Sequence, residues 1–293
     1  MTHSGNPFGQ VLVALVTPMT ADGEVDWPAV EKHMDDVISA GADGIVVTGT
    51  TGETSTLTDP EKLRLVEVGK DVAAGRAKII TGGGSNETAH AIELYKASEK
   101  AGADGIMIVT PYYNKPTQAG ILTHFRLVAD ATDLPVILYD IPGRTGVPIK
   151  YETILRLAKH PNIMAVKDAK GDFLDAATLI QETGLAWYSG DDPLNLPWLS
   201  VGATGVISVV GHAAPHALRE LVTSFENGDL TRAREINAKT LNVLASQQGA
   251  LGGVTFAKAA LRLQGIEVGD PRLPVAAATE EQVSRLREDL TKA

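Results

Sequence analysis

The segment Ala40-Gly41-Ala42-Asp43-Gly44-Ile45 decides the fold, because nearly the same residues occur again as Ala101-Gly102-Ala103-Asp104-Gly105-Ile106. A looser copy is Gly202-Ala203-Thr204-Gly205-Val206. In each copy a glycine suited to the end of a helix precedes a short turn, and an apolar strand follows the turn. The repetition predicts one helix–turn–strand unit that is used several times along the chain.

Short apolar segments and amphipathic segments alternate over most of the sequence, which predicts strands and helices in alternation. The expected strands are Val11–Thr17, Gly44–Thr48, Lys78–Thr81, Gly105–Val109, Pro135–Tyr139, Ile163–Lys167, Leu185–Ser189 and Gly205–Val209. Among the expected helices are Trp27–Ala40, Pro60–Ala74, Glu87–Ala101 and Gln118–Ala131. Strands that are continuously apolar and separated by helices indicate a parallel sheet covered on both faces.

Eight such units favour an α/β fold that closes into a (β/α)8 TIM barrel. The alternative is an open doubly wound sheet, but no G-x-G-x-x-G follows the first strand. After about Gly228 only helical patterns remain, at Leu230–Gln247, Thr255–Leu263 and Glu280–Lys292. We therefore expect a catalytic barrel in residues 1–228 and a C-terminal helical domain in residues 229–293.

Composition excludes several classes of protein. The 293 residues carry a net charge of −10 without a basic tract, which argues against nucleic acid as a partner. The absence of cysteine excludes disulfides and thiolate metal sites. The seven histidines are scattered, so neither a metal nor a cofactor is expected. No apolar run is long enough to span a membrane and no signal peptide is evident, so we expect a cytoplasmic location.

Lys167 stands out because four apolar residues, Ile163 to Val166, lead directly into it. A lysine at the end of a buried strand is costly unless it is paired or neutral. A lysine with a lowered pKa is a nucleophile, and its typical chemistry is a Schiff base with a carbonyl compound. The segment alone favours the structural interpretation, a lysine that snorkels or forms an ion pair, for example with Asp168.

Other polar residues also follow expected strands, and catalytic groups of a barrel collect at the C-terminal ends of its strands. Taken singly, each has an ordinary structural explanation as a turn residue, a core cap or a surface ion pair. Around a Schiff-base lysine, a tyrosine within a relay of hydroxyls can move protons. The turn at Thr50 and Thr51 offers backbone N–H groups to a carboxylate. The planar guanidinium of Arg144 can donate two parallel hydrogen bonds to a second carboxylate.

Four motifs together resemble the dihydrodipicolinate synthase family, and the resemblance covers nearly the whole chain. They are Gly49-Thr50-Thr51-Gly52-Glu53, Pro111-Tyr112-Tyr113-Asn114-Lys115-Pro116, Tyr139-Asp140-Ile141-Pro142-Gly143-Arg144-Thr145-Gly146 and Val166-Lys167-Asp168-Ala169. The stretches that follow Lys167 and Tyr188 are similar to the actinobacterial branch. The resemblance implies a lyase of lysine and diaminopimelate biosynthesis that condenses pyruvate with L-aspartate 4-semialdehyde.

The resemblance also implies roles for individual residues. Lys167 would form the Schiff base, Tyr139 would transfer protons, and Thr50 and Tyr113 would complete the relay, with Tyr113 reaching in from a neighbouring subunit. The substrate-binding residues would be Thr51 and Ile207 through their main chains, Arg144 through its guanidinium, and Gly190. The family is usually a homotetramer, a dimer of dimers.

Two alternatives remain at this stage. N-acetylneuraminate lyases and 2-keto-3-deoxy sugar-acid aldolases share the fold and the lysine, but Arg144 and the Thr50-Thr51 pair favour the synthase. A catalytically silent binding homologue is disfavoured, because every expected catalytic position is filled.

Many family members are inhibited by lysine, which binds at a dimer interface. The corresponding positions here are Asp59, Lys62, Asn86, His90 and Tyr112. A carboxylate found in lysine-sensitive members is missing, and Lys62 adds a like charge. We therefore expect lysine to inhibit weakly or not at all.

Overall fold

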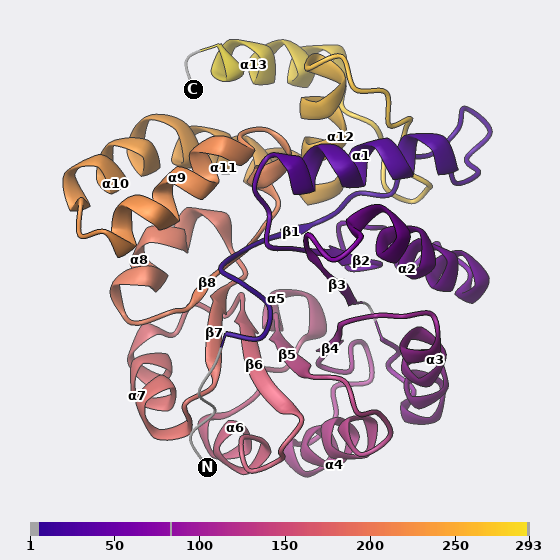
Figure 1. The fold of residues 1–293 in the computed structure, drawn as a ribbon, viewed down its shortest axis with the longest axis vertical. Coiled ribbons are helices and arrows are strands. Elements are labelled where there is room, and N and C mark those ends of the chain that lie inside the picture. Colours follow the sequence, from indigo (N-terminus) through magenta and orange to yellow (C-terminus); the bar gives the residue numbers. More distant parts are fainter. Residues whose placement is uncertain (1–5, 83, 292–293) are drawn as a thin grey trace.

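The structure, a computed structural model, describes residues 6–82 and 84–291. Neighbouring strands are parallel, and they close into a barrel in the order β1-β2-β3-β4-β5-β6-β7-β8 (Figure 1). The predicted (β/α)8 TIM barrel is therefore confirmed. The strands are β1 (Val11–Ala14), β2 (Gly44–Val47), β3 (Lys78–Thr81), β4 (Gly105–Val109), β5 (Val136–Asp140), β6 (Ile163–Asp168), β7 (Ala186–Ser189) and β8 (Gly205–Ser208).

Helices surround this barrel on its outer side (Figure 1). The helices that follow the eight strands are α1 (Trp27–Ser39), α2 (Asp59–Ala73), α3 (Thr88–Lys100), α4 (Gln118–Ala129), α6 (Tyr151–Leu157), α7 (Phe173–Thr183), α8 (Asn195–Ser200) and α9 (Pro215–Glu226). Three shorter helical pieces lie in the loops after β5, β7 and β8: α5 (Pro142–Thr145), η1 (Asp192–Leu194) and η2 (Val210–His212). The predicted helices and strands agree with these elements to within a few residues.

The repeated segment ends its helix in the same way each time. Gly41, Gly102 and Gly202 have φ of 104°, 95° and 102°, a left-handed conformation that favours glycine. The N–H of the next residue bonds back five positions, as in Ala42 to Val37 and Ala103 to Ser98, which is the Schellman ending of a helix. This ending turns the chain from the helix into the following strand, so the repeat builds the barrel.

The barrel interior is packed at its N-terminal end. Gly105 has no side chain because the ring of Phe8 lies there, and a Cβ on Gly105 would come within 2.5 Å of the Phe8 Cε1 atom. Phe8, Leu12, Ile80, Ile137 and other inward-facing residues form one buried cluster that also contains Tyr139. Phe8 thus fills the N-terminal end of the barrel interior, and we therefore expect a site at the C-terminal ends of the strands.

The C-terminal helices are α10 (Leu230–Ile236), α11 (Asn242–Leu251), α12 (Gly253–Leu263) and α13 (Glu280–Leu290). A π-helical turn, η3 (Asn237–Leu241), joins α10 to α11, where one regular helix was expected. These helices share an apolar cluster with β1, β8 and α9. The division into domains at residue 228 stays a prediction. Within the described residues, no helix combines the length and apolar character that crossing a membrane requires.

Candidate active site

A cavity of about 280 Å³ opens at the C-terminal ends of the strands. Six predicted site residues line it: Thr50, Thr51, Tyr139, Arg144, Lys167 and Gly190. Its other walls are Ala14, Gly49, Met107, Ile141, Gly143, Ala169, Asp191, Val209, Gln248 and Gly253. The structure therefore brings together predicted site residues that are far apart in the sequence. Thr50 and Gly190, the two most distant, are 140 positions apart.

Lys167 is buried in this cavity with only 4% of its surface exposed. The parallel pairing of β5 with β6 places it beside Tyr139, and its Nζ lies 4.4 Å from the centroid of the Tyr139 ring. Burial lowers the pKa of Lys167 to about 8; the negative charge of Asp192 opposes this shift and the positive charge of Arg144 adds to it. About a tenth of the amine is therefore uncharged at pH 7, far more than for a lysine of ordinary pKa, and the uncharged form is the nucleophile.

The alternative ion pair between Lys167 and Asp168 is not formed. Asp168 is the next residue of the strand, so its side chain points to the opposite face of the sheet. There its Oδ1 accepts hydrogen bonds from the N–H groups of Lys170 (2.7 Å) and Gly171 (2.9 Å). Among the described residues, no carboxylate oxygen lies within 4.0 Å of the Lys167 Nζ. Lys167 is thus buried without a direct counter-ion.

Tyr139 and Thr50 form the expected pair of hydroxyl groups. Burial raises the pKa of Tyr139 to about 12, although the charge of Arg144 and a hydrogen bond with the Thr50 side chain pull the pKa down. The phenol is therefore protonated near neutral pH and is able to donate a proton. The Thr50 hydroxyl is in position to stabilise the phenolate that such a transfer leaves.

Tyr113 lies apart from this pair. Its side chain is 90% exposed, its φ is 72°, and it is not among the residues that line the cavity. A second cavity of about 250 Å³ adjoins the first, because both are lined by Thr50, Tyr139 and Arg144. Tyr112 lies on the wall of this adjoining cavity. Tyr113 of the same chain therefore lines neither of these two cavities.

The turn after β2 presents backbone donors. Among the described residues, the N–H groups of Thr50 and Thr51 have no hydrogen-bond acceptor, although the turn itself is closed by a bond from the Glu53 N–H to the Thr50 carbonyl (3.1 Å). The Thr17 hydroxyl also holds the turn by donating to the Gly52 carbonyl (2.8 Å). Two free N–H groups from residues that line the same cavity as Lys167 suit a small carboxylate.

Gly190 and Ile207 occupy different positions. A Cβ on Gly190 would lie 3.0 Å from both the Asp168 carbonyl oxygen and the Lys167 Cγ, so a side chain there would crowd the lysine. Ile207 is buried in the cluster of inward-facing barrel residues, and Val209 rather than Ile207 lines the cavity. The main-chain contact predicted for Ile207 stays a prediction.

Two features were missed by sequence reasoning. Asp192, in the loop after β7, accepts hydrogen bonds from the N–H groups of Val209 (2.8 Å) and Val210 (3.0 Å), and its charge acts on Lys167. Gln248 and Gly253 bring the C-terminal helices to the cavity. No local motif marks these residues, because their partners are distant in the sequence.

Lys170 lies in the bend that follows β6, where the sequence alone suggests a solvated turn residue. Its side chain is only 17% exposed, and its charge acts on the buried carboxyls of Asp140 and Asp168. Burial, together with the negative charge of Asp168, raises the pKa of Asp140 to about 7. A hydrogen bond from the Ile149 N–H and the positive charge of Lys170 oppose this rise. Lys170 is thus partly buried, and its charge acts on carboxyls behind the catalytic strands.

The residues of the expected lysine pocket form a small polar network. Asp59 accepts from the Lys62 Nζ at 3.0 Å and lies 2.7 Å from the His90 Nε2. Asn86 donates through its Nδ2 to the Tyr112 carbonyl at 3.2 Å. The single carboxylate of this group is therefore already shared between two nitrogen-bearing side chains.

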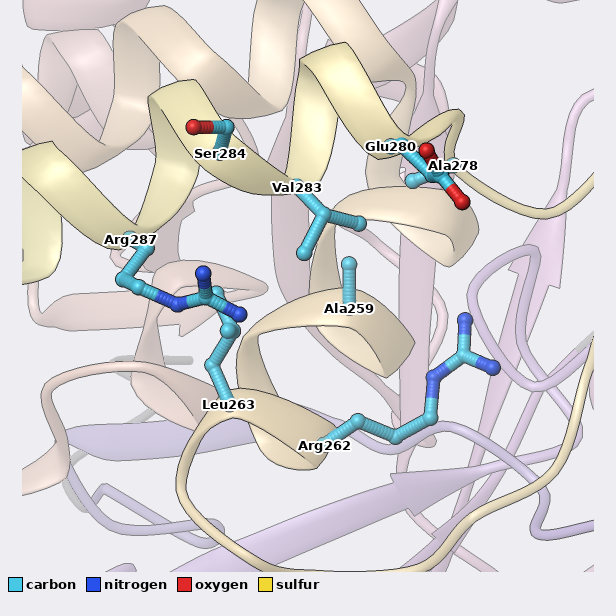
Figure 2. A pocket seen from close by; sticks show the side chains of 8 residues that line it. All are labelled: Ala259, Arg262, Leu263, Ala278, Glu280, Val283, Ser284 and Arg287. Carbon is cyan, nitrogen blue, oxygen red and sulfur yellow. The ribbon is translucent and has the colours of Figure 1, made fainter.

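A larger hollow, of about 490 Å³, lies between α12 and α13 (Figure 2) and shares no lining residue with the cavity around Lys167. Val283 and Ala259 face one another across it, with Arg262 and Arg287 toward its ends (Figure 2). It contains no nucleophile of lowered pKa, so the smaller cavity around Lys167 is the candidate active site. Among the described residues no group of three potential metal ligands is found, and the expected absence of a metal stays a prediction.

The profile of the dihydrodipicolinate synthetase family matches residues 7–293. The chain belongs to this family. The 4-hydroxy-tetrahydrodipicolinate synthase of Corynebacterium aurimucosum is 60% identical over 286 residues, which is 98% of this chain and 95% of that protein. The enzyme of the same name from Mycolicibacterium paratuberculosis is 54% identical, with the same two coverages. The resemblance to the actinobacterial type is thereby confirmed.

Solved structures of the family superpose closely on this chain. The dihydrodipicolinate synthase of Cyanidioschyzon merolae with lysine bound has a TM-score of 0.95 and 42% identity, over 98% of this chain and 99% of that chain. The synthase of Acinetobacter baumannii complexed with pyruvate has a TM-score of 0.92 and 40% identity, over 97% and 98%. The dihydrodipicolinate synthetase fold therefore extends over nearly the whole chain.

The pKa of Lys167 predicts how its amine reacts. Carbamylation by cyanate requires the uncharged amine, so its rate at Lys167 should rise with pH through a midpoint of about 8. In Arg144→Met the midpoint should move to higher pH, because a cation that lowers the lysine pKa has been removed. Peptide mass spectrometry measures the rate, and the denatured chain, where lysine has its ordinary pKa of about 10.4, is the control. A midpoint equal to that of the denatured chain would contradict the prediction.

Proposed function

We propose that the protein acts as a 4-hydroxy-tetrahydrodipicolinate synthase, a lyase that condenses pyruvate with L-aspartate 4-semialdehyde. One observation carries the proposal: a buried lysine with its pKa lowered to about 8 lies 4.4 Å from the centroid of a tyrosine ring, at the open end of a barrel. Membership of a family whose relatives bear this enzyme name supports the same reaction.

The first step is attack of the uncharged Lys167 amine on the keto carbon of pyruvate. The carbonyl oxygen gains a proton as the carbinolamine forms, and loss of water then gives the imine. Tyr139 supplies and recovers these protons, because its raised pKa keeps the phenol protonated until a basic oxygen develops beside it. Loss of a methyl proton converts the imine to an enamine, whose carbon attacks the aldehyde.

Two anionic groups must be held during this reaction. The free N–H groups of Thr50 and Thr51 take the pyruvate carboxylate, and the Arg144 guanidinium takes the carboxylate of the semialdehyde. Arg144 lines the same cavity as Lys167, which supports the synthase over the sugar-acid aldolases and N-acetylneuraminate lyase. The occupied catalytic positions support an enzyme over a silent homologue.

Tyr113 completes the relay from a neighbouring subunit, in a homotetramer built as a dimer of dimers. Its 90% exposed side chain and the adjoining cavity beside Thr50 and Tyr139 support this arrangement. Lysine is a weak inhibitor or none, since Asp59 is already engaged by Lys62 and His90. The cytoplasmic location stays a prediction of the sequence.

Borohydride reduction in the presence of pyruvate tests the function. The wild-type protein should gain the mass of one reduced pyruvate on Lys167 and should turn over aspartate semialdehyde in preference to N-acetylmannosamine. Lys167→Ala should lose both properties while it keeps its fold by circular dichroism. Tyr139→Phe should lower the rate by about 10²–10⁴-fold, the usual contribution of a positioned acid–base group. A wild-type protein without an adduct would refute the proposal.

Coexpression of two inactive variants tests the role of Tyr113. Tyr113→Ala and Lys167→Ala should each be nearly inactive alone. In a mixed dimer, the subunit that keeps Lys167 receives Tyr113 from its partner, so random pairing should restore about a quarter of the wild-type rate, as expected for a two-fold interface. A tyrosine that acts within its own chain would give no recovery.

A lysine titration tests the regulatory prediction. The initial rate should be unchanged at micromolar lysine, because the ligand ammonium lacks a free anionic partner and meets the charge of Lys62. Lys62→Glu restores a carboxylate, so this variant should be the more sensitive of the two. Micromolar inhibition of the wild-type protein would show that the pocket is intact.

A further inference from the structure

A buried ion pair joins the substrate turn to the C-terminal helices. Lys258 on α12 has a fully buried side chain, and its Nζ lies 2.7 Å from the Oε1 of Glu53, whose side chain is 2% exposed. Glu53 ends the Gly49-to-Glu53 motif that begins with the turn after β2. Two charges removed from water in this way are costly unless each is well paired.

Both partners of this pair are bound further. The Glu53 Oε2 accepts a hydrogen bond from the Arg272 N–H at 2.7 Å, and the Lys258 Nζ donates to the Asp270 carbonyl at 3.1 Å. The Arg272 guanidinium lies 2.6 Å from the Oε1 of Glu61, on α2. Residues of the segment 258–272 therefore bind both the loop between β2 and α2 and α2 itself.

Glu53 is hydrogen-bonded to the turn that faces the cavity. Its backbone has φ of 62°, and its N–H bonds to the Thr50 carbonyl at 3.1 Å, within the turn that presents the free N–H groups of Thr50 and Thr51. Gly52, within the same turn, packs closely against the loop after β1, since a Cβ on Gly52 would lie 3.1 Å from the Leu15 carbonyl oxygen. A shift of the Glu53 carboxylate is therefore transmitted to these donors.

We infer that Lys258 and Glu53 are positioning residues for pyruvate: their buried ion pair holds the Thr50–Thr51 turn so that its N–H groups meet the pyruvate carboxylate beside Lys167. The inference rests on the proposed function and adds a dependence of the barrel site on the C-terminal helices. Neither side chain lines the cavity, so both act through the turn and not on the substrate.

The inference is tested with Lys258→Met, which keeps the length of the side chain and removes its charge. The concentration of pyruvate that gives half-maximal borohydride trapping should rise by about tenfold to a hundredfold, the range expected when a binding group is displaced by up to about 1 Å. KM for pyruvate should rise with it, while the KM for the aldehyde changes little. Lys239→Met, which removes a lysine that is 72% exposed and paired with Glu235 in the same C-terminal region, is the matched control and should behave as wild type.

A purely structural role would lower the melting temperature without changing the pyruvate dependence of the folded protein, and that result would overturn the inference. Where Lys258→Met fails to fold, Glu53→Gln with Lys258→Met removes both buried charges and is judged by the same criterion. Equal effects in Lys239→Met would also overturn it. Borohydride trapping of the wild-type protein separates the two proposals. If the wild-type protein forms no adduct with pyruvate, the proposed function is refuted. If the wild-type protein forms the adduct and Lys258→Met has the same pyruvate dependence, only the positioning role is refuted.

Discussion

The pairing of β5 with β6 is the constraint on which the site depends. Its register sets Tyr139 beside Lys167 and Asp140 beside Asp168. Because side chains alternate along a strand, the first pair faces the barrel interior and the second faces the surrounding helices. The amine and the phenol thus share one cavity, where burial moves their pKa values to about 8 and about 12. The two carboxyls stay on the other side of the sheet, so neither neutralises the amine by direct contact.

The sequence was sufficient for the fold because the information is local and repeated. The glycines at 41, 102 and 202 each end a helix with the same hydrogen bonds, and each is followed by a strand. Lys167 and Tyr139 were found for a similar reason: a polar residue at the end of an apolar strand is conspicuous, and the barrel topology brings such ends together. The motif around Thr50 and Thr51 required no knowledge of distant contacts either.

The rest of the site could not be read in this way, because it depends on contacts between distant segments. Asp192 resembles a helix cap in the sequence, yet its carboxylate is held by the N–H groups of Val209 and Val210. Lys258 lies in an unremarkable amphipathic helix, and only the folded chain shows that it meets Glu53. Gln248 reaches the cavity from a helix that follows the π-helical turn η3, and helical periodicity in the sequence predicted no such irregularity.

The charge of the cavity explains how a protein of net charge −10 can accept anionic substrates. Arg144 and the free N–H groups of the Thr50–Thr51 turn give the cavity its own donors, independent of the overall charge. The charge of Arg144 also lowers the pKa of both Lys167 and Tyr139. For the lysine this means more of the nucleophilic, uncharged amine; for the tyrosine it means a stronger acid. A single cation that anchors a carboxylate thus favours both the attack on the carbonyl and the proton transfer that accompanies it.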